Sequence, residues 1–140
     1  MSEVRTPDAN VDAVRRFFEL MHAKDIEAWG ELWAEDCRII VPYPPDGFPT
    51  RIEGRAELLS GFRRLFGNFE TYDYEIRALY RTDDPEVVVV EWGVTARIAS
   101  TGALYEGDNI TVFHFENGRI VEYHDYFNPE KFGAVVAALP

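Results

Sequence analysis

The strongest constraint on the fold is a change of hydrophobic period near residue 71. From there to residue 127, apolar and polar residues alternate, as they do in strands that turn one face to a core. Three turn signals interrupt the alternation: "DDP" at 83–85, "STG" at 100–102 and "ENG" at 116–118. We therefore predict four long strands in an antiparallel meander.

Two of these strands have strongly apolar faces. One face of "TYDYEIRALY" carries Tyr72, Tyr74, Ile76, Ala78 and Tyr80. One face of "PEVVVVEWGVTARI" carries Val88, Val90, Trp92, Val94, Ala96 and Ile98. Strands of this length curl, and we expect the interior glycines Gly93 and Gly107 to be bend or bulge points.

Helical spacing dominates the first half of the chain. Residues 11–23 predict an amphipathic helix with Asp8 or Asn10 as its cap, and residues 25–35 a second short helix. The strand "RIIVPY" follows and ends at a proline-rich loop. Residues 55–67, after Gly54, predict a third helix, and a final helix follows the last strand. The fold class is therefore α+β, with helices packed into the concave side of a curved sheet.

Composition narrows the possible functions. The 140 residues fit a single domain, 1–140. The formal net charge of −11 would repel nucleic acid, so we exclude that class of partner. No apolar run approaches a membrane span or a leader segment, so we expect a cytoplasmic protein that does not bind membranes. The single cysteine, Cys37, forms no intrachain disulfide, and we interpret it as a buried structural thiol.

An acid in the last strand is the main candidate for chemistry. In "GRIVEYHDYFNPEKF", residues 118–132, strand alternation puts Asp125 on one face with Val121, Tyr123 and Phe127. A carboxylate among apolar neighbours has a raised pKa, which suits it to proton transfer near neutral pH. Alternatively, it accepts hydrogen bonds that make the core rigid, or lies at a wet cavity mouth.

The turn before this strand decides which residue lies opposite Asp125. A two-residue Asn-Gly turn would pair Ile110 with Asp125. A three-residue loop with Gly118 in the left-handed region would pair Asn109 with Asp125 and Thr111 with Tyr123. The alternation also places His114 and His124 on the opposite face, where we expect surface or interface residues. No set of His, Cys or carboxylate residues has the sequence spacing of metal ligands.

The order of elements resembles the nuclear transport factor two-like superfamily over essentially the whole chain. The similarity lies in two helices, "WAEDC" before a short strand, the proline-rich loop, a third helix, the meander and the ending "GRIVEYHDYFNPEKF". The resemblance implies a cone-shaped, cystatin-like α+β fold with a deep pocket between sheet and helices. Its members include ketosteroid isomerases, limonene epoxide hydrolases, SnoaL-type cyclases and the PhzA/PhzB proteins.

Residue by residue, the resemblance favours one branch. Ketosteroid isomerases have a Tyr, a general base and a second acid where this chain has Phe17, Val41 and Thr111, so their mechanism is not expected. Epoxide hydrolases have their water-activating Asp at Asp125, and this alignment favours the three-residue turn. Their Arg and second Asp correspond to Trp92 and Val94 here.

The SnoaL-like / PhzA-PhzB-like branch is the closest in pattern. Its members carry a Glu in an acid-aromatic-x-Asn-Pro ending, and "DYFNP" at 125–129 is similar to it. Their pocket His corresponds to Arg55, which could bind an acidic substrate or face water.

We expect a cofactor-independent protein that binds a small, largely apolar or aromatic cyclic ligand, with Asp125 catalysing an isomerisation, cyclisation or condensation. The alternatives are a non-catalytic binding protein, an epoxide hydrolase-like enzyme with a degenerate triad, and a purely structural dimeric module. The apolar outer face of the sheet predicts a homodimer, and no metal or cofactor is expected. The substrate-binding candidates are Asn109, Thr111, Tyr123, Phe127, Trp92, Tyr43, Phe17, Met21 and Phe62.

Overall fold

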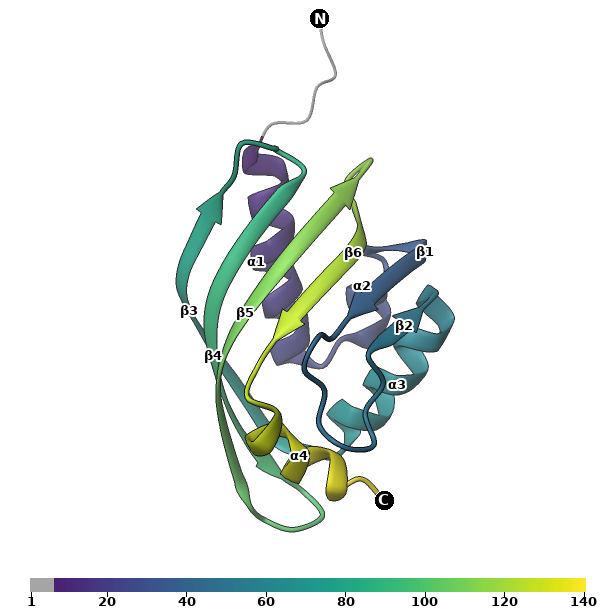
Figure 1. Ribbon diagram of the computed structural model, residues 1–140, viewed down its shortest axis with the longest axis vertical. Helices are drawn as coiled ribbons and strands as arrows, with labels where there is room; N and C mark the ends of the chain where they lie inside the picture. Colours follow the sequence, from purple (N-terminus) through teal and green to yellow (C-terminus); the bar gives the residue numbers. More distant parts are fainter. Residues whose placement is uncertain (1–6) are drawn as a thin grey trace, which may run out of the picture.

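The computed structural model describes residues 7–140, which form one six-stranded sheet and four helices (Figure 1). In chain order the elements are α1 (Pro7–Ala23), α2 (Ile26–Gly30), β1 (Trp33–Ile40), β2 (Arg51–Glu53), α3 (Arg55–Gly67), β3 (Phe69–Arg81), β4 (Val87–Ile98), β5 (Leu104–Glu116), β6 (Arg119–Tyr126) and α4 (Pro129–Ala137). The strand order is β2-β1-β6-β5-β4-β3. Only the β1–β6 pair is parallel among these strands. The sheet is curved and unclosed, which confirms the predicted α+β class.

The four strands of the meander are β3 to β6, as predicted. The six inward residues of β4 from Val88 to Ile98 are at most 4% exposed, so this strand is the centre of the concave face. The β4–β5 register runs without interruption through Gly93 and Gly107. The expectation of bulges at these glycines is therefore wrong.

One register shift that changes the strand faces lies instead in β3, next to Arg77. The β3–β4 register shifts between Ile76 and Ala78, which reverses the two faces of the strand beyond that point. Leu79 consequently packs against the core, whereas Tyr80 is 47% exposed and donates a hydrogen bond to Glu91. The prediction that Ala78 and Tyr80 share the inward face is wrong for this reason, since they pair with Glu91 and Val89 on the outer face of β4.

Another bulge sets the register of β6 against β5. Asn117 and Gly118 both have positive φ, 53° and 80°, and form a two-residue turn that pairs Glu116 with Arg119. The register then shifts by one residue after the Phe115–Ile120 pair, so that Thr111 lies opposite Asp125. Both predicted pairings are therefore wrong, because each assumed a regular ladder.

The first strand begins earlier than predicted. Residues 33–35, expected in the second helix, belong to β1 because Trp33 pairs with Ile120 of β6 and its ring is fully buried. α2 is consequently only one turn long, capped by the Asp25 carboxylate, which accepts a hydrogen bond from Ala28 N. The short strand β2 was not predicted and pairs with β1.

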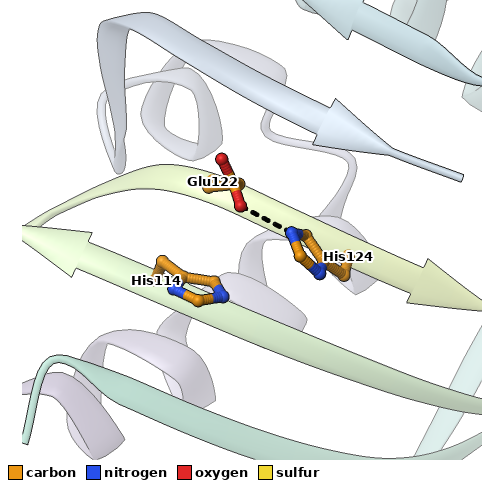
Figure 2. Close-up of side chains that lie close together, drawn as sticks. All are labelled: His114, Glu122 and His124. Carbon is orange, nitrogen blue, oxygen red and sulfur yellow. Dashed lines mark hydrogen bonds and ion pairs between the residues drawn. The ribbon is translucent and has the colours of Figure 1, made fainter. Parts of the chain in front are cut away.

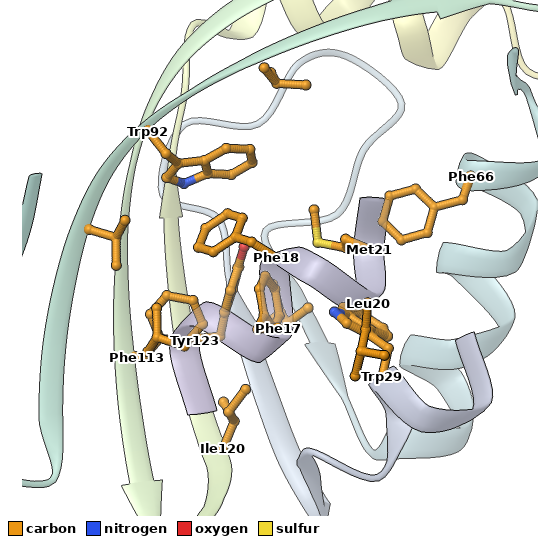
Figure 3. Close-up of a cluster of buried hydrophobic side chains, with 14 of the residues drawn as sticks. Phe17, Phe18, Leu20, Met21, Trp29, Phe66, Trp92, Phe113, Ile120 and Tyr123 are labelled. Carbon is orange, nitrogen blue, oxygen red and sulfur yellow. The ribbon is translucent and has the colours of Figure 1, made fainter. Parts of the chain in front are cut away.

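The N-terminal helix fills the concave side of the sheet. Its predicted apolar stripe is buried, and Phe17 contacts five other rings at centroid distances of 5.0–6.1 Å (Figure 3). Because α1 begins at Pro7, the predicted caps lie within the helix. Asn10 is buried and donates to Pro85 O and Glu86 Oε1, tying α1 to the turn between β3 and β4.

The C-terminal helix lies across one end of the sheet (Figure 1). The side chain of Asn128 caps it, accepting hydrogen bonds from the backbone of Glu130 and Lys131. Phe132 of α4 contacts Phe127 and also Phe48 of the loop 41–50, at ring distances of 4.7 and 5.5 Å. In residues 7–140, no helix has both the length and the apolar composition to span a bilayer.

Candidate functional site

A cavity of about 60 Å³ lies between the concave face of the sheet and the helices. Side chains from α1, α3, α4, the loop 41–50 and all six strands line it, and most of them are aromatic or aliphatic. Its polar lining residues are Tyr72, Tyr105, Asn109, Tyr123 and Asp125. Among the lining residues that the structure describes, Asp125 carries the one carboxyl group, so any acid–base chemistry in this cavity centres on it.

A chain of two hydrogen bonds fixes the Asp125 carboxyl group. Trp92 Nε1 donates to Thr111 Oγ1 at 2.9 Å, and the Thr111 hydroxyl donates to Asp125 Oδ1 at 3.0 Å. The three residues lie on the adjacent strands β4, β5 and β6, and Thr111 is fully buried. Since the indole N–H supplies the donor to Thr111, the threonine proton is free to point at the carboxylate.

Burial raises the pKa of Asp125 from 3.8 to about 7, while the hydrogen bond from Thr111 acts in the opposite direction. This is the direction expected for an acid on an apolar strand face. Near neutral pH the group therefore exists in both its acid and its base form.

Three phenol groups share the cavity with this acid. Burial raises the pKa values of Tyr72, Tyr105 and Tyr123 above the usual value, and the charge of Asp125 raises them further. All three are therefore neutral phenols that can donate hydrogen bonds.

Asn109 adds an acceptor that has no partner within residues 7–140. Its side chain lines the cavity and is 8% exposed, and its buried Oδ1 has no hydrogen-bond donor. Gly107 also faces inward on β5 and leaves room for the Tyr105 hydroxyl. A β-carbon at residue 107 would lie only 2.7 Å from that hydroxyl oxygen. The glycine thus lets a phenol fold over the strand into the cavity.

Seven of the ten candidate residues line the cavity: Met21, Phe62, Trp92, Asn109, Tyr123, Asp125 and Phe127. The other three do not. Tyr43 is 65% exposed, Phe17 is enclosed by other rings, and Thr111 lies behind Asp125. Arg55 donates to Trp33 O at 3.1 Å, so it joins α3 to β1.

Sequence reasoning missed four notable cavity residues: Tyr72, Tyr105, Phe48 and Phe132. The alternation along β3 could have identified Tyr72, because the sequence already placed this residue on the apolar face of the strand. Tyr105 could have been identified in the same way, because it lies on the same face of β5 as Asn109. Phe48 and Phe132 come from a loop and a terminal helix, whose positions follow only from tertiary packing.

Residues able to hold a metal lie outside this cavity. His114, Glu122 and His124 meet on the outer face of β5 and β6, the face predicted for both histidines (Figure 2). Their spacing along the chain does not identify them, because they meet through the register of two strands.

The curved sheet, the enclosed helices and the cavity between them define a protein of the nuclear transport factor two-like superfamily. Within it, residues 14–123 match the SnoaL-like domain, and the chain belongs to this family. The chain is 33% identical over 126 residues to the uncharacterized protein YesE of Bacillus subtilis, covering 87% of this chain and 86% of YesE.

Two further comparisons agree with this assignment. A PhzA/B-like protein of Pseudomonas aeruginosa is 31% identical over 123 residues, covering 85% of this chain and 86% of that protein. The crystal structure of an isomerase candidate from Bacillus subtilis superposes with a TM-score of 0.85 and 30% identity, covering 94% of each chain. The resemblance inferred from the sequence is thereby confirmed.

Proposed function

We propose that this protein binds a small, largely apolar cyclic molecule in the cavity and that Asp125 transfers a proton to or from it without a cofactor. One observation carries the proposal: a carboxyl group in an apolar cavity with a pKa of about 7. The isomerase candidate and the PhzA/B-like relative are consistent with small-molecule chemistry of this kind.

In the proposed reaction, Asp125 takes a proton from a carbon of the ligand next to a carbonyl group and returns it elsewhere. Thr111 holds Oδ1, so we assign the transfer to Oδ2. The neutral phenols of Tyr72 and Tyr105 are the donors for the ligand oxygen on which charge develops. Isomerisations, cyclisations and condensations all begin with this removal of a proton. In an isomerisation Asp125 returns the proton to another carbon, and in the other two it gives the proton to the oxygen of the carbonyl group that the new carbon–carbon bond attacks.

Ligand binding requires some movement of the walls. The cavity of about 60 Å³ is well below the ~300–1,000 Å³ of common ligand pockets. Phe48, Phe127 and Phe132 close the end beneath α4, and they belong to a loop, a strand end and a short helix. We assign ligand access to this end, because side-chain rotation there leaves the sheet intact.

A second copy of the chain is the partner that we propose for the outer face of the sheet. Val87, Val89, Ile110, Val112 and Tyr126 lie on this face, and Ile110 is 44% exposed. Such an apolar surface is costly to leave in water, and two copies related by a two-fold axis would cover it.

Binding without turnover is the second candidate function. It is supported by the unpaired Asn109 acceptor, which a bound O–H or N–H group would satisfy whether or not chemistry follows. An epoxide hydrolase-like reaction has less support, because Trp92 and Val94 occupy the positions of the Arg and second Asp, and both line the cavity.

The experiment begins with a thermal-shift screen of small cyclic ketones, enones and aromatic acids. A ligand that binds only the folded state raises the melting temperature by mass action. Each ligand found is then incubated with wild type, Asp125→Asn and the control Asp12→Asn, whose carboxyl is exposed on α1. Product is followed by NMR, and carbon-bound proton exchange in deuterated water is followed as well.

We expect Asp125→Asn to retain binding and to lose proton exchange by at least ~100-fold, the lower end of a general acid–base contribution. Asp12→Asn should match wild type. Binding with no exchange in wild type would favour the binding protein, and exchange that survives in Asp125→Asn would refute the proposed role of Asp125.

A further inference from the structure

Two histidines and a glutamate meet on the side of the sheet away from the helices (Figure 2). His114 lies opposite Glu122 in the β5–β6 ladder, and His124 is the next residue of β6 on the same face. His124 Nε2 is 2.6 Å from Glu122 Oε2, and the two imidazole rings are 5.1 Å apart. One ligand atom from each residue lies within 4.8 Å of the other two.

Arg38 of β1 holds the glutamate in place. Its Nε and Nη2 atoms donate to Glu122 Oε1 at 2.9 and 2.7 Å. The other oxygen, Oε2, is therefore turned toward His124. Residues that hydrogen-bond a ligating carboxylate orient it and strengthen a metal site.

We propose that His114, Glu122 and His124 form a binding site for a divalent transition-metal ion of the zinc class. Two imidazole nitrogens and one carboxylate oxygen are ligands that Zn²⁺ prefers, and a water would complete the tetrahedron. The imidazoles favour Zn²⁺, Co²⁺ or Ni²⁺ over Mg²⁺ and Ca²⁺, which take oxygen ligands. The ion would replace the hydrogen bond between His124 and Glu122.

The geometry requires only small side-chain rotations. Ligand atoms about 2.0–2.2 Å from a tetrahedral Zn²⁺ lie roughly 3.3 Å apart, compared with separations of up to 4.8 Å here. The backbone positions are fixed by the strand ladder. In a single chain the His124 and Glu122 side chains are 26% and 23% exposed, so solvent reaches them. They lie on the same outer sheet face as Val112 and Tyr126, so in the proposed dimer the ion would bind beside the contact with the second copy. The formal net charge of −11 also attracts cations.

The site is separate from the cavity. His124 and Asp125 are consecutive residues of β6 and point to opposite faces of the sheet, as do His114 and Phe113 of β5. The metal site therefore does not depend on the proposed proton transfer, and either proposal can fail without the other.

Calorimetric titration of untagged protein with Zn²⁺ tests the proposal, with Mg²⁺ as the comparison ion. The variants are His114→Gln, His124→Gln and Glu122→Gln. His22→Gln is the matched control, because His22 is the one other histidine of the chain and lies on α1, bonded through Nδ1 to Tyr72 O. Circular dichroism confirms that each variant is folded.

We expect one Zn²⁺ per chain in wild type and His22→Gln, and no binding of Mg²⁺. Removing a residue that only hydrogen-bonds a metal ligand lowers metal affinity by ~10–100-fold. Each of the three ligand variants should lower the Zn²⁺ affinity by more than this. In the wild-type protein, Zn²⁺ should shift the imidazole NMR signals of His114 and His124 and leave those of His22 unchanged. The proposed site would be refuted if wild type bound no Zn²⁺, if His22→Gln lost as much Zn²⁺ affinity as the ligand variants, or if His124→Gln kept the wild-type affinity.

Discussion

The protonation of Asp125 links the cavity to the stability of the whole chain. The inward direction of the Asp125 side chain could be predicted, because the residues from Tyr123 to Phe127 alternate regularly between the two faces of the strand. The hydrogen-bond partner of Asp125 could not be predicted, because one extra residue in β6 moves Thr111 into the position opposite Asp125. Trp92 was predicted to line the pocket, and its second role as the donor to Thr111 follows only from the folded register.

The raised pKa of Asp125 predicts a specific pH dependence of stability. The folded state, with a pKa of about 7, binds this proton more tightly than the unfolded chain, whose value is near 3.8. Stability is therefore lost as pH rises from about 4 to about 7, and the loss is complete above that window. At about 1.4 kcal/mol per pKa unit, the full effect is roughly 4 kcal/mol.

Asp125→Asn removes this titration. We expect the variant to gain stability over wild type at about pH 8 by up to roughly 4 kcal/mol, with a smaller gain at about pH 5. Urea unfolding at the two pH values measures the difference, and Asp12→Asn serves as the control. A difference between wild type and Asp125→Asn that does not change with pH would contradict the raised pKa.

At the scale of elements, hydrophobic period predicted the meander and α3 well. α3 was located at residues 55–67, where the structure has it. The failures occur where tertiary pairing overrides local pattern: residues 33–35 join a strand because Trp33 pairs with β6, and β2 exists only as a partner of β1. Bulges at Arg77 and Val121 leave no clear mark in a single sequence.

The outer face of the sheet carries a prediction about assembly. If a second copy covers it, Ile110→Lys places a charge in the contact, and the protein should shift from dimer to monomer in sedimentation velocity. Leu104→Lys is the control, because Leu104 is 52% exposed at the start of β5, away from the centre of this face. A monomeric wild type, or an unchanged dimer in Ile110→Lys, would contradict the homodimer.

At the scale of the molecule, the cavity results from how a curved sheet packs on helices of limited length. α1 fills one end of the concave side with aromatic side chains, whereas the other end is covered by α4 and the loop 41–50 (Figures 1 and 3). The superfamily could be predicted from the order of elements. The size of the cavity could not, because it depends on how Phe48, Phe127 and Phe132 meet.

The pKa of Asp125 is the central quantity, and a carbon-detected NMR titration of its carboxyl group measures it directly, with Asp125→Asn providing the assignment. We predict a value near 7, because burial in an apolar cavity outweighs the hydrogen bond from Thr111. A value at or below the ~3.9 of a model peptide would show a carboxylate that is charged in the folded protein, and would contradict proton transfer by Asp125 near neutral pH.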